Sequence, residues 1–322
     1  MNGHADPLAA ALETTPETER AVAALVRAAD RPAPHFWEPG VGKEIYVPVE
    51  GAEIRVFHFR SPDTRARRPI VLVPGFGVIP DGFQDFFAAV HGMSELYYVE
   101  TREKSSSRIA AGRADMSVSR SARDLAQAFS FLGLEGRDFL LFAPCWGASI
   151  CLQGLIEGSL RAPTFLMADP MHTLWFPKWL LRYVSPLLPV GVVRLLRPMF
   201  ARAMLGDMQE PTQRARANAF VYGADIWKWQ KSAEAAKDFE LYGRLRAIRR
   251  EVFVLNGTRD KIHDQRDYPR LAAEMPRGRF ISMPTGESNR ERLFGAAALE
   301  FARIAAADGL PRSLEVYEKK LR

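Results

Sequence analysis

The sequence predicts an α/β fold: a doubly wound, mostly parallel sheet with an inserted helical cap. Short, continuously apolar segments alternate with helical patterns along the chain, as expected of parallel strands buried on both faces. One long segment, residues 171–250, has helical patterning and no strand signal. We therefore expect an N-terminal helical extension at 1–43, a core at 44–170 and 251–322, and a cap at 171–250.

The first elements are predicted by capping and alternation. Thr15 is a favourable N-cap and Pro16 suits the first helical position, so a helix should begin there and end near Asp30. Segments 44–49 and 53–60 alternate apolar and polar residues on either side of a short turn. This pattern predicts an antiparallel hairpin at an edge of the sheet.

The parallel strands are predicted from runs of apolar residues. These runs are residues 69–77, 96–100, 139–143, 164–170, 251–257 and 279–284, and we expect the last two to end the sheet. A helical pattern at 117–132 lies between the second and third runs. Strands that alternate with helices are joined by crossovers of one hand, which gives a parallel sheet covered on both faces.

The overall charge is basic but diffuse. The 322 residues include 44 Lys and Arg against 38 Asp and Glu, a formal charge of +6. Much of this excess is arginine spread over predicted helix surfaces, which favours solvated faces over nucleic-acid binding. The densest basic cluster, a candidate surface for an anionic substrate or a lipid, is Arg244, Arg246, Arg249 and Arg250.

Several classes of protein are disfavoured by the patterns the sequence lacks. There is no secretory signal pattern and no uninterrupted apolar run of about 18 residues, so we expect a cytoplasmic protein without a spanning helix. We found no metal-ligand spacing, phosphate-binding loop or dinucleotide fingerprint, so we expect neither metal nor cofactor. The two cysteines, Cys145 and Cys151, are too close along one turn and helix to form a disulfide framework.

One segment carries a chemical signature. Residues 139–155, FLLFAPCWGASICLQGL, predict a strand, a sharp turn and a helix with Cys145 at the apex. The small residues Ala143 and Gly147 flank it at two positions on either side, where larger side chains would collide with the neighbouring helix and strand. The pattern resembles the nucleophile elbow of the α/β-hydrolase superfamily, and the order of elements extends the resemblance from about residue 44 to about residue 308.

Two further features stand where that resemblance places them. Pro74-Gly75-Phe76-Gly77 follows a predicted buried strand and is similar to the superfamily's His-Gly-x-Gly loop, with proline in place of histidine. The resemblance implies that the backbone N–H groups of Phe76 and Trp146 bind a developing oxyanion. Asp260, soon after the strand at 251–257, resembles the residue that supplies the catalytic acid.

The superfamily's histidine is missing. It would follow the last strand, where Gly286 is succeeded by Glu287 and no histidine appears. The candidates for a substitute base are Glu287 and His263, with His172 a weaker one. A carboxylate base beside Asp260 would raise one of the two pKa values and disfavour a thiolate, so the sequence leaves the base open.

The cap is rich in large apolar residues: Trp175, Phe176, Trp179, Leu180, Leu181, Leu187, Leu188, Val192, Val193, Trp227 and Trp229. One hypothesis is that they line a pocket for an apolar acyl or ring-bearing substrate. A second is that they only hold the cap on the sheet. A third places Lys178, Arg182 and Arg194 against an anionic membrane surface.

The functional prediction is a cysteine-dependent hydrolase or acyltransferase for an apolar ester, thioester or related acyl substrate. Cys145 would be the nucleophile and Asp260 the acid or orienting group, with Glu287 or His263 as the substitute base. The missing histidine keeps two alternatives open. One is a binding or scaffold protein without turnover, and the other is a lyase or transferase that uses the same pocket.

Overall fold

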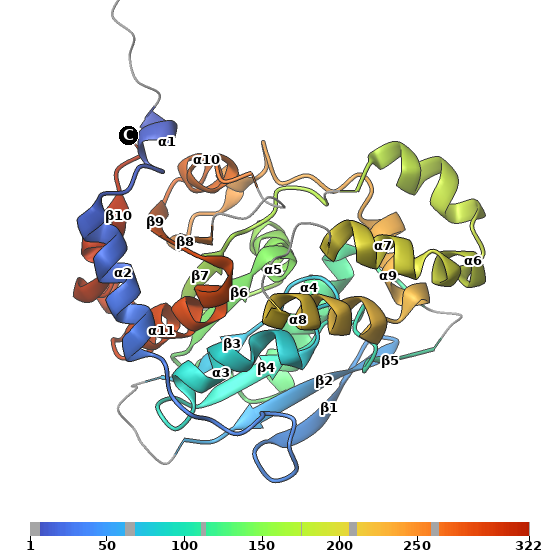
Figure 1. Cartoon of the computed structure of the whole chain (residues 1–322), viewed down its shortest axis with the longest axis horizontal. Coiled ribbons are helices and arrows are strands. Elements are labelled where there is room, and N and C mark those ends of the chain that lie inside the picture. Colours follow the sequence, from blue (N-terminus) through green and yellow to red (C-terminus); the bar gives the residue numbers. More distant parts are fainter. Residues whose placement is uncertain are drawn as a thin grey trace, which may run out of the picture.

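The computed structural model describes residues 7–61, 68–110, 114–174, 176–205, 211–258 and 264–321. Within these residues a ten-stranded mixed sheet crosses the molecule, with helices on both faces (Figure 1). The strand order is β1-β2-β4-β3-β6-β7-β8-β9-β10, and β5 pairs with β2. The pairs from β4 through β9 are all parallel, whereas β1, β2, β5 and β10 join antiparallel. The predicted fold class is confirmed.

The strands are short, and most coincide with the predicted apolar runs. They are β1 (Lys43–Val49), β2 (Ala52–Phe59), β3 (Ile70–Leu72), β4 (Leu96–Val99), β5 (Arg108–Ile109), β6 (Leu140–Pro144), β7 (Thr164–Ala168), β8 (Val252–Thr258), β9 (Gly278–Thr285) and β10 (Glu318–Lys319). The expectation that the sheet ends with the strand at 279–284 is wrong, because β10 pairs antiparallel with β9. A two-residue strand is too short to produce an alternating pattern, which also explains why β5 was not predicted.

Successive residues of the central strands enter two separate cores, as the pleat of a doubly wound sheet requires. On β6, Leu141 and Ala143 pack in one core while Leu140 and Phe142 pack in the other. The first core is covered by α4 (Val118–Phe131), α5 (Cys145–Glu157) and α10 (Asp267–Glu274), and the second by α2 (Pro16–Ala28), α3 (Gln84–Val90) and α11 (Arg290–Ala302). A short helix, α1 (Pro7–Ala10), precedes α2.

The predicted N-terminal helix and the predicted edge hairpin are both confirmed. The Thr15 hydroxyl accepts a hydrogen bond from the Thr18 N–H at 3.2 Å, and α2 begins at Pro16. β1 and β2 form the predicted hairpin at the edge of the sheet. Val22 and Val26 of α2 are buried in the core of the α11 face, so this helix packs on the sheet domain.

The arginines are less uniformly solvated than the sequence suggested. Arg68, Arg102 and Arg120 are each at most 3% exposed. Arg102 on the loop after β4 donates to both carboxylate oxygens of Asp124 on α4, at 2.5 and 2.8 Å. Helical patterning alone does not reveal which cations a buried carboxylate compensates.

In the segment 171–250, the described residues form helices and turns. The longer helices are α6 (Val190–Leu195), α7 (Arg197–Leu205), α8 (Pro211–Gly223) and α9 (Ile226–Ala235). Lys228 of α9 is buried, and its ammonium group donates to the backbone carbonyls of Lys104, Ser105 and Ser107. This contact ties α9 to the loop that follows β4.

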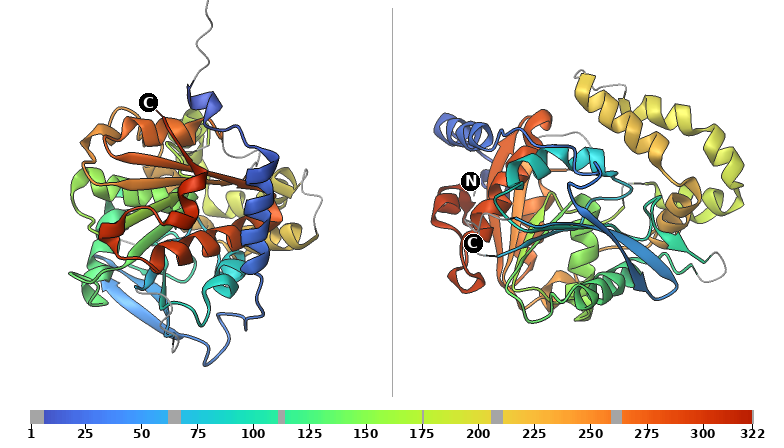
Figure 2. Two further views of the ribbon diagram at one scale, coloured as in Figure 1. Left: turned by 90° about the vertical axis from the view of Figure 1, so that its left-hand side faces the viewer. Right: turned by 90° about the horizontal axis from the view of Figure 1, so that it is seen from below.

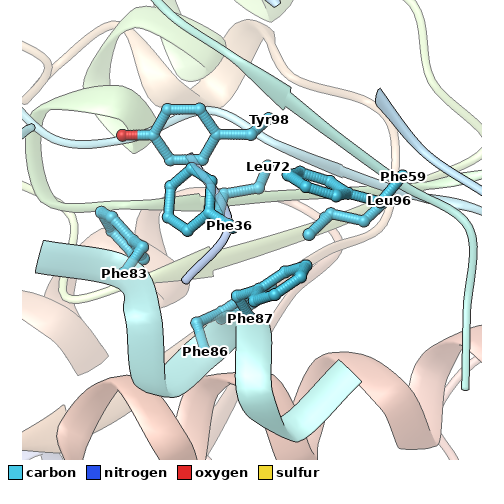
Figure 3. A pocket seen from close by; sticks show the side chains of 8 residues that line it. All are labelled: Phe36, Phe59, Leu72, Phe83, Phe86, Phe87, Leu96 and Tyr98. Carbon is cyan, nitrogen blue, oxygen red and sulfur yellow. The ribbon is translucent and has the colours of Figure 1, made fainter. Parts of the chain in front are cut away.

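An aromatic cluster fills the space between α3 and the sheet. Its members are Phe36, Phe59, Leu72, Phe83, Phe86, Phe87, Leu96 and Tyr98, whose side chains face one another in Figure 3. Each is at most 5% exposed, and the gap between them leaves no space for a water molecule. The cluster is therefore part of the core, not a ligand site.

Candidate active site

Cys145 occupies a strained turn between β6 and α5. Its φ is 52°, in the left-handed region that cysteine rarely adopts. The residue before it ends the strand and the residue after it is already helical. Such strain persists only where the surrounding fold enforces it, and it clusters at functional sites. The predicted strand-to-helix turn is confirmed.

The surroundings of this turn require small residues. A Cβ atom added to Gly147 would lie 2.3 Å from the Val73 carbonyl oxygen and 2.6 Å from that of Pro74. Ala143, on the other side of the turn, is completely buried. The helix can approach the end of β3 this closely only because residue 147 is glycine, as the sequence pattern predicted.

The loop after β3 packs directly on the cysteine. A Cβ atom added to Gly75 would lie 3.3 Å from the Cβ and 3.7 Å from the sulfur of Cys145. The backbone of Pro74-Gly75-Phe76-Gly77 therefore borders the thiol. Trp146 is in the first turn of α5, where N–H groups have no acceptor within the helix. The helix dipole also favours negative charge at this end.

A buried ion pair fixes the conformation of this loop. Glu103 and Lys104 are each at most 3% exposed and lie 2.9 Å apart. The Lys104 ammonium donates to the Gly75 carbonyl, and the Gly77 N–H donates to the Glu103 carboxylate at 3.4 Å. Burial opposes the charge of Glu103, yet Lys104 and Thr101 hold the pKa of its carboxyl below the ordinary value. The buried Glu103–Lys104 pair thus holds the loop at both Gly75 and Gly77.

Aromatic side chains surround the same region. The ring of Phe76 packs against Trp146 and Trp229, with centroids 6.3 and 5.5 Å apart. Trp229 also contacts Phe220 at 4.7 Å, and Trp146 contacts Phe239 at 5.2 Å. Since α9 carries Trp229, one residue of the predicted cap lining contacts the loop that borders the cysteine.

Other cap residues behave differently. Phe176 and Leu181 pack on the core, as expected of side chains that hold the cap in place. Trp179, Leu187 and Val192 are exposed, so for them both the lining and the packing hypotheses are wrong. Trp175 lies outside the described residues.

The loop after β7 covers the thiol. The Cys145 sulfur donates to the Met171 sulfur at 3.4 Å. The Ser149 hydroxyl, one turn along α5, donates to the Met171 carbonyl at 2.6 Å and anchors the loop. Cys145 is partly exposed, whereas Cys151 is buried and burial raises the pKa of its thiol far above the ordinary value. The two thiols therefore differ in accessibility, and the buried Cys151 thiol resists ionisation.

The sequence reasoning missed a second strained residue, Asp169. It follows β7 with φ 45° and is completely buried. Pro144 and Ala168 are register partners on adjacent parallel strands, so the next residues, Cys145 and Asp169, leave neighbouring strand ends. Adjacent strands lie about 4.8 Å apart. Among the described residues, these two are the non-glycine positions with positive φ.

Asp169 is paired with Arg290. Its carboxylate accepts from the Gly257 N–H at 3.0 Å and from Arg290 Nε at 3.1 Å. Arg290 opens α11, directly after the one-turn helix η6 (Glu287–Asn289) that follows β9. This is the segment in which the superfamily resemblance places a histidine. The only signal in the sequence for Asp169 was an aspartate directly after an apolar strand. No pattern in the sequence indicated that it pairs with an arginine 121 residues away.

The other predicted site residues are only partly described. Asp260 and His263 lie outside the described residues. Glu287 begins η6, and its side chain is not among those described. Their predicted roles stay predictions.

The histidines of the described chain have partners elsewhere. His172 has Glu240 at 2.9 Å from Nδ1 and Asp267 at 3.5 Å from Nε2, and it packs on Tyr242. His58 bonds to Glu95 and stacks on Tyr97. The remaining two, His35 and His91, pack against Trp37 and Phe87. Both ring nitrogens of His172 therefore face carboxylates rather than the Cys145 thiol.

Two negative findings concern metal binding and membrane spanning. In the part of the chain that the structure describes, His, Cys, Asp and Glu side chains form no group of three that could hold a metal ion. The described helices include none that is long and apolar enough to span a bilayer.

The sequence matches no family model and no curated protein, but the structure resembles many solved ones. A thermophilic esterase from Thermogutta terrifontis matches with a TM-score of 0.63 and 17% identity, over 82% of this chain and 99% of that one. A hydrolase from Pseudomonas aeruginosa matches with a TM-score of 0.62 and 16% identity, over 82% and 99%. An enol-lactonase from Burkholderia xenovorans matches with a TM-score of 0.58 and 16% identity, over 74% and 90%. Together with the sheet order and the turn at Cys145, these similarities show that the chain has the α/β-hydrolase fold.

Proposed function

We propose that the protein is a cysteine-dependent acyl-transfer enzyme, a hydrolase or acyltransferase for apolar esters or thioesters. The observation that carries the proposal is the thiol of Cys145, held at φ 52° between β6 and α5. A partly exposed sulfur on a strained turn at a helix N-terminus has the placement of an activated nucleophile. The esterase, hydrolase and lactonase folds that the chain resembles support this reaction class.

The chemistry would run in two steps. The sulfur of Cys145 attacks the acyl carbon, the ester C–O bond breaks, and the alcohol leaves with the thiol proton. Water then attacks the thioester carbon, the C–S bond breaks, and the carboxylic acid leaves while the sulfur takes a proton from the water. An acceptor alcohol can take the place of the water, in which case a new ester leaves. The N–H groups of Phe76 and Trp146 are proposed to bind the oxyanion in both steps, each contributing about 3 kcal/mol. The rings of Phe76, Trp146 and Trp229 favour an apolar acyl group.

Arg290 is proposed as a positioning residue that favours the thiolate. Its guanidinium is fixed by the buried carboxylate of Asp169, which leaves the strand end next to that of Cys145. A cation near a thiol stabilises the nucleophilic anion. His263 and Glu287 stay candidates for the base that activates water in the second step, and Asp260 for the acid or orienting group, each to be tested by its own alanine variant.

Acylation of Cys145 is the direct test. Incubation with a p-nitrophenyl ester of an apolar carboxylic acid should add one acyl group to the peptide that contains Cys145, as read by mass spectrometry. The Cys145→Ala variant should not be labelled. Cys151→Ala should be labelled normally, because the Cys151 thiol is buried and its pKa is raised. An unlabelled Cys145 in a folded protein would refute the proposal.

The role of Arg290 has a matched control on the same helix. Arg290 and Arg292 have side-chain exposures of 21% and 22%, and each pairs with carboxylates, Arg292 with Asp30 and Asp85 on the other side of the helix. We expect Arg290→Gln to label about tenfold more slowly at neutral pH, a barrier about 1.4 kcal/mol higher. Its labelling should recover at higher pH, where the thiol ionises without help. Equal rates and pH profiles for Arg290→Gln and Arg292→Gln would rule out the role.

A second candidate function is ligand binding without turnover. It is favoured because the segment after β9, where the superfamily resemblance places a histidine, instead supplies Arg290, which forms an ion pair with Asp169. In that case ester binding would be measurable by calorimetry, while Cys145 stays unmodified over long incubation. The same labelling experiment therefore separates the two candidates.

A further inference from the structure

The segment from Phe176 to Arg202 is largely apolar but scarcely buried. Among its described side chains, only Leu181 and Ala201 are buried. None of the residues of α6, whose sequence is VGVVRL, is buried. The large apolar side chains that this segment exposes are Trp179, Tyr183, Leu187, Val192, Leu195 and Met199. A soluble surface rarely exposes so many large apolar groups in one segment, and such a surface usually marks an interaction site.

The charge of the same region has one sign. From residue 170 to residue 206 the sequence contains no Asp or Glu and five Lys or Arg. Lys178, Arg194 and Arg202 are exposed, whereas Arg182 is paired with Asp238 and Arg197 donates to backbone carbonyls. The surface of this segment therefore carries exposed apolar groups and cations, and the segment itself contains no carboxylate to neutralise those cations.

The shape of the cap leaves this surface open. α6 contacts α7 and α9, and α7 contacts α8, so these helices pack mainly on one another. In the right-hand view of Figure 2 the yellow helices of this region stand out from the body of the molecule. The cap is anchored to the loop after β4 through Lys228 of α9. The side of the cap that faces away from this loop, its outer side, is open to another partner.

We propose that this outer cap surface, formed by residues 176–202, docks on an anionic lipid bilayer. Cations beside exposed leucine, tryptophan and tyrosine side chains are the composition that binds at the boundary between headgroups and acyl chains. The negative surface potential of an anionic leaflet complements the exposed cations Lys178, Arg194 and Arg202. Docking in this way would bring the enzyme's cap to the phase in which apolar esters concentrate, but the proposal does not depend on the reaction at Cys145.

A second copy of the chain is the less suitable occupant. In a twofold symmetric dimer the same surface meets itself, so Lys178, Arg194 and Arg202 would enter an interface whose other side carries the same cations. Like charges across an interface oppose association. A surface without carboxylates thus favours an anionic partner.

The test is cosedimentation of the full chain with two kinds of vesicle, phosphatidylcholine alone and phosphatidylcholine with phosphatidylglycerol. We expect binding to the anionic vesicles and much weaker binding to the neutral ones, with affinity falling as salt is added. Leu187 and Leu195 are each 80% exposed, so the double variant Leu187→Ser/Leu195→Ser should fold normally. It should bind anionic vesicles more than about tenfold more weakly.

Matched controls lie on other surfaces. Phe131 and Val316 are 55% and 69% exposed and lie outside the cap, so Phe131→Ser/Val316→Ser should bind as the native chain does. Arg194→Gln should weaken binding about fivefold. Failure to bind anionic vesicles, equal loss in the control variant, or concentration-dependent dimers that the cap variant abolishes would each overturn the proposal.

Discussion

Replacing Gly147 by alanine should lower the free energy of unfolding by about 3 kcal/mol, because the new methyl group overpacks a rigid contact. The added Cβ would lie 2.3 Å from the Val73 carbonyl oxygen and 2.6 Å from that of Pro74. Both atoms belong to backbone, so no flexible side chain can move away. Urea denaturation would measure the change as a lower midpoint.

The same substitution should affect the chemistry more than the fold. Val73 and Pro74 lead into the loop that packs on Cys145, so any shift of their backbone displaces Gly75 and Phe76. A displacement of about 1 Å can cost a hundredfold in rate. We therefore expect acyl labelling of Cys145 to fall about a hundredfold in the fraction that stays folded.

Gly191 provides the control, since it is also a helical glycine and an added Cβ would meet no atom within 4 Å apart from its chain neighbours and the backbone of its own helix. Gly191→Ala should leave stability unchanged or raise it by up to about 1 kcal/mol through helix propensity. If Gly147→Ala instead behaves like Gly191→Ala in both stability and labelling, the close contact at the turn is absent in solution.

The second large effect is expected at Arg102. Its guanidinium is 1% exposed and donates to both oxygens of Asp124, as well as to the carbonyls of Asp115 and Glu50. Arg102→Met keeps much of the side-chain volume but leaves the buried carboxylate with Arg120 alone. Removing one partner of a buried pair costs about 3 to 5 kcal/mol. Calorimetric or urea unfolding at neutral pH would detect this loss.

The loss should depend on pH in a defined direction. Burial raises the pKa of Asp124 in the folded protein, although Arg102 and Arg120 pull it down. Removing Arg102 removes part of that pull, so the folded-state pKa rises further above the unfolded value of about 3.9. A raised carboxyl pKa destabilises the fold above that pKa, and protonation relieves the penalty as pH falls through it. The difference between Arg102→Met and the native chain should therefore be greatest at neutral pH and shrink on acidification.

Arg108 supplies a comparison for this prediction. Its ion pair with Glu53 joins side chains that are 61% and 43% exposed. Arg108→Met should change stability by less than about 1 kcal/mol at any pH, because exposed pairs contribute little. Equal effects of the two substitutions, or a penalty at Arg102 that grows in acid, would contradict the assignment of Asp124 as a compensated buried charge.

The elements that were predictable from the sequence depend on local physics. The hairpin of β1 and β2 follows from alternation, and the start of α2 follows from the Thr15 cap and Pro16. The turn at Cys145 is predictable because the small residues Ala143 and Gly147 stand two positions on either side of it, although the atoms that crowd Gly147 belong to Val73 and Pro74. In each case the sequence signal lies within a few residues of the element that it predicts.

The errors concern features that depend on distant partners. Helical periodicity could not tell that Leu187 and Val192 face solvent, because a cap that stands out from the body has no core for them to enter. The burial of Arg102 was equally hidden, since Asp124 lies 22 residues away on another element. Two-residue strands such as β10 are too short to leave a pattern.

The sequence by itself determined that a cysteine stands at the junction of a strand and a helix, because a tight turn requires small flanking residues and these can be identified directly in the sequence. Only the tertiary structure decided that Asp169 leaves the adjacent strand end and that Arg290 reaches it. The physical reason is that strand order and register bring these residues together. The register in turn is selected by burying apolar side chains in the two cores on either face of the sheet, to which residues along the whole chain contribute.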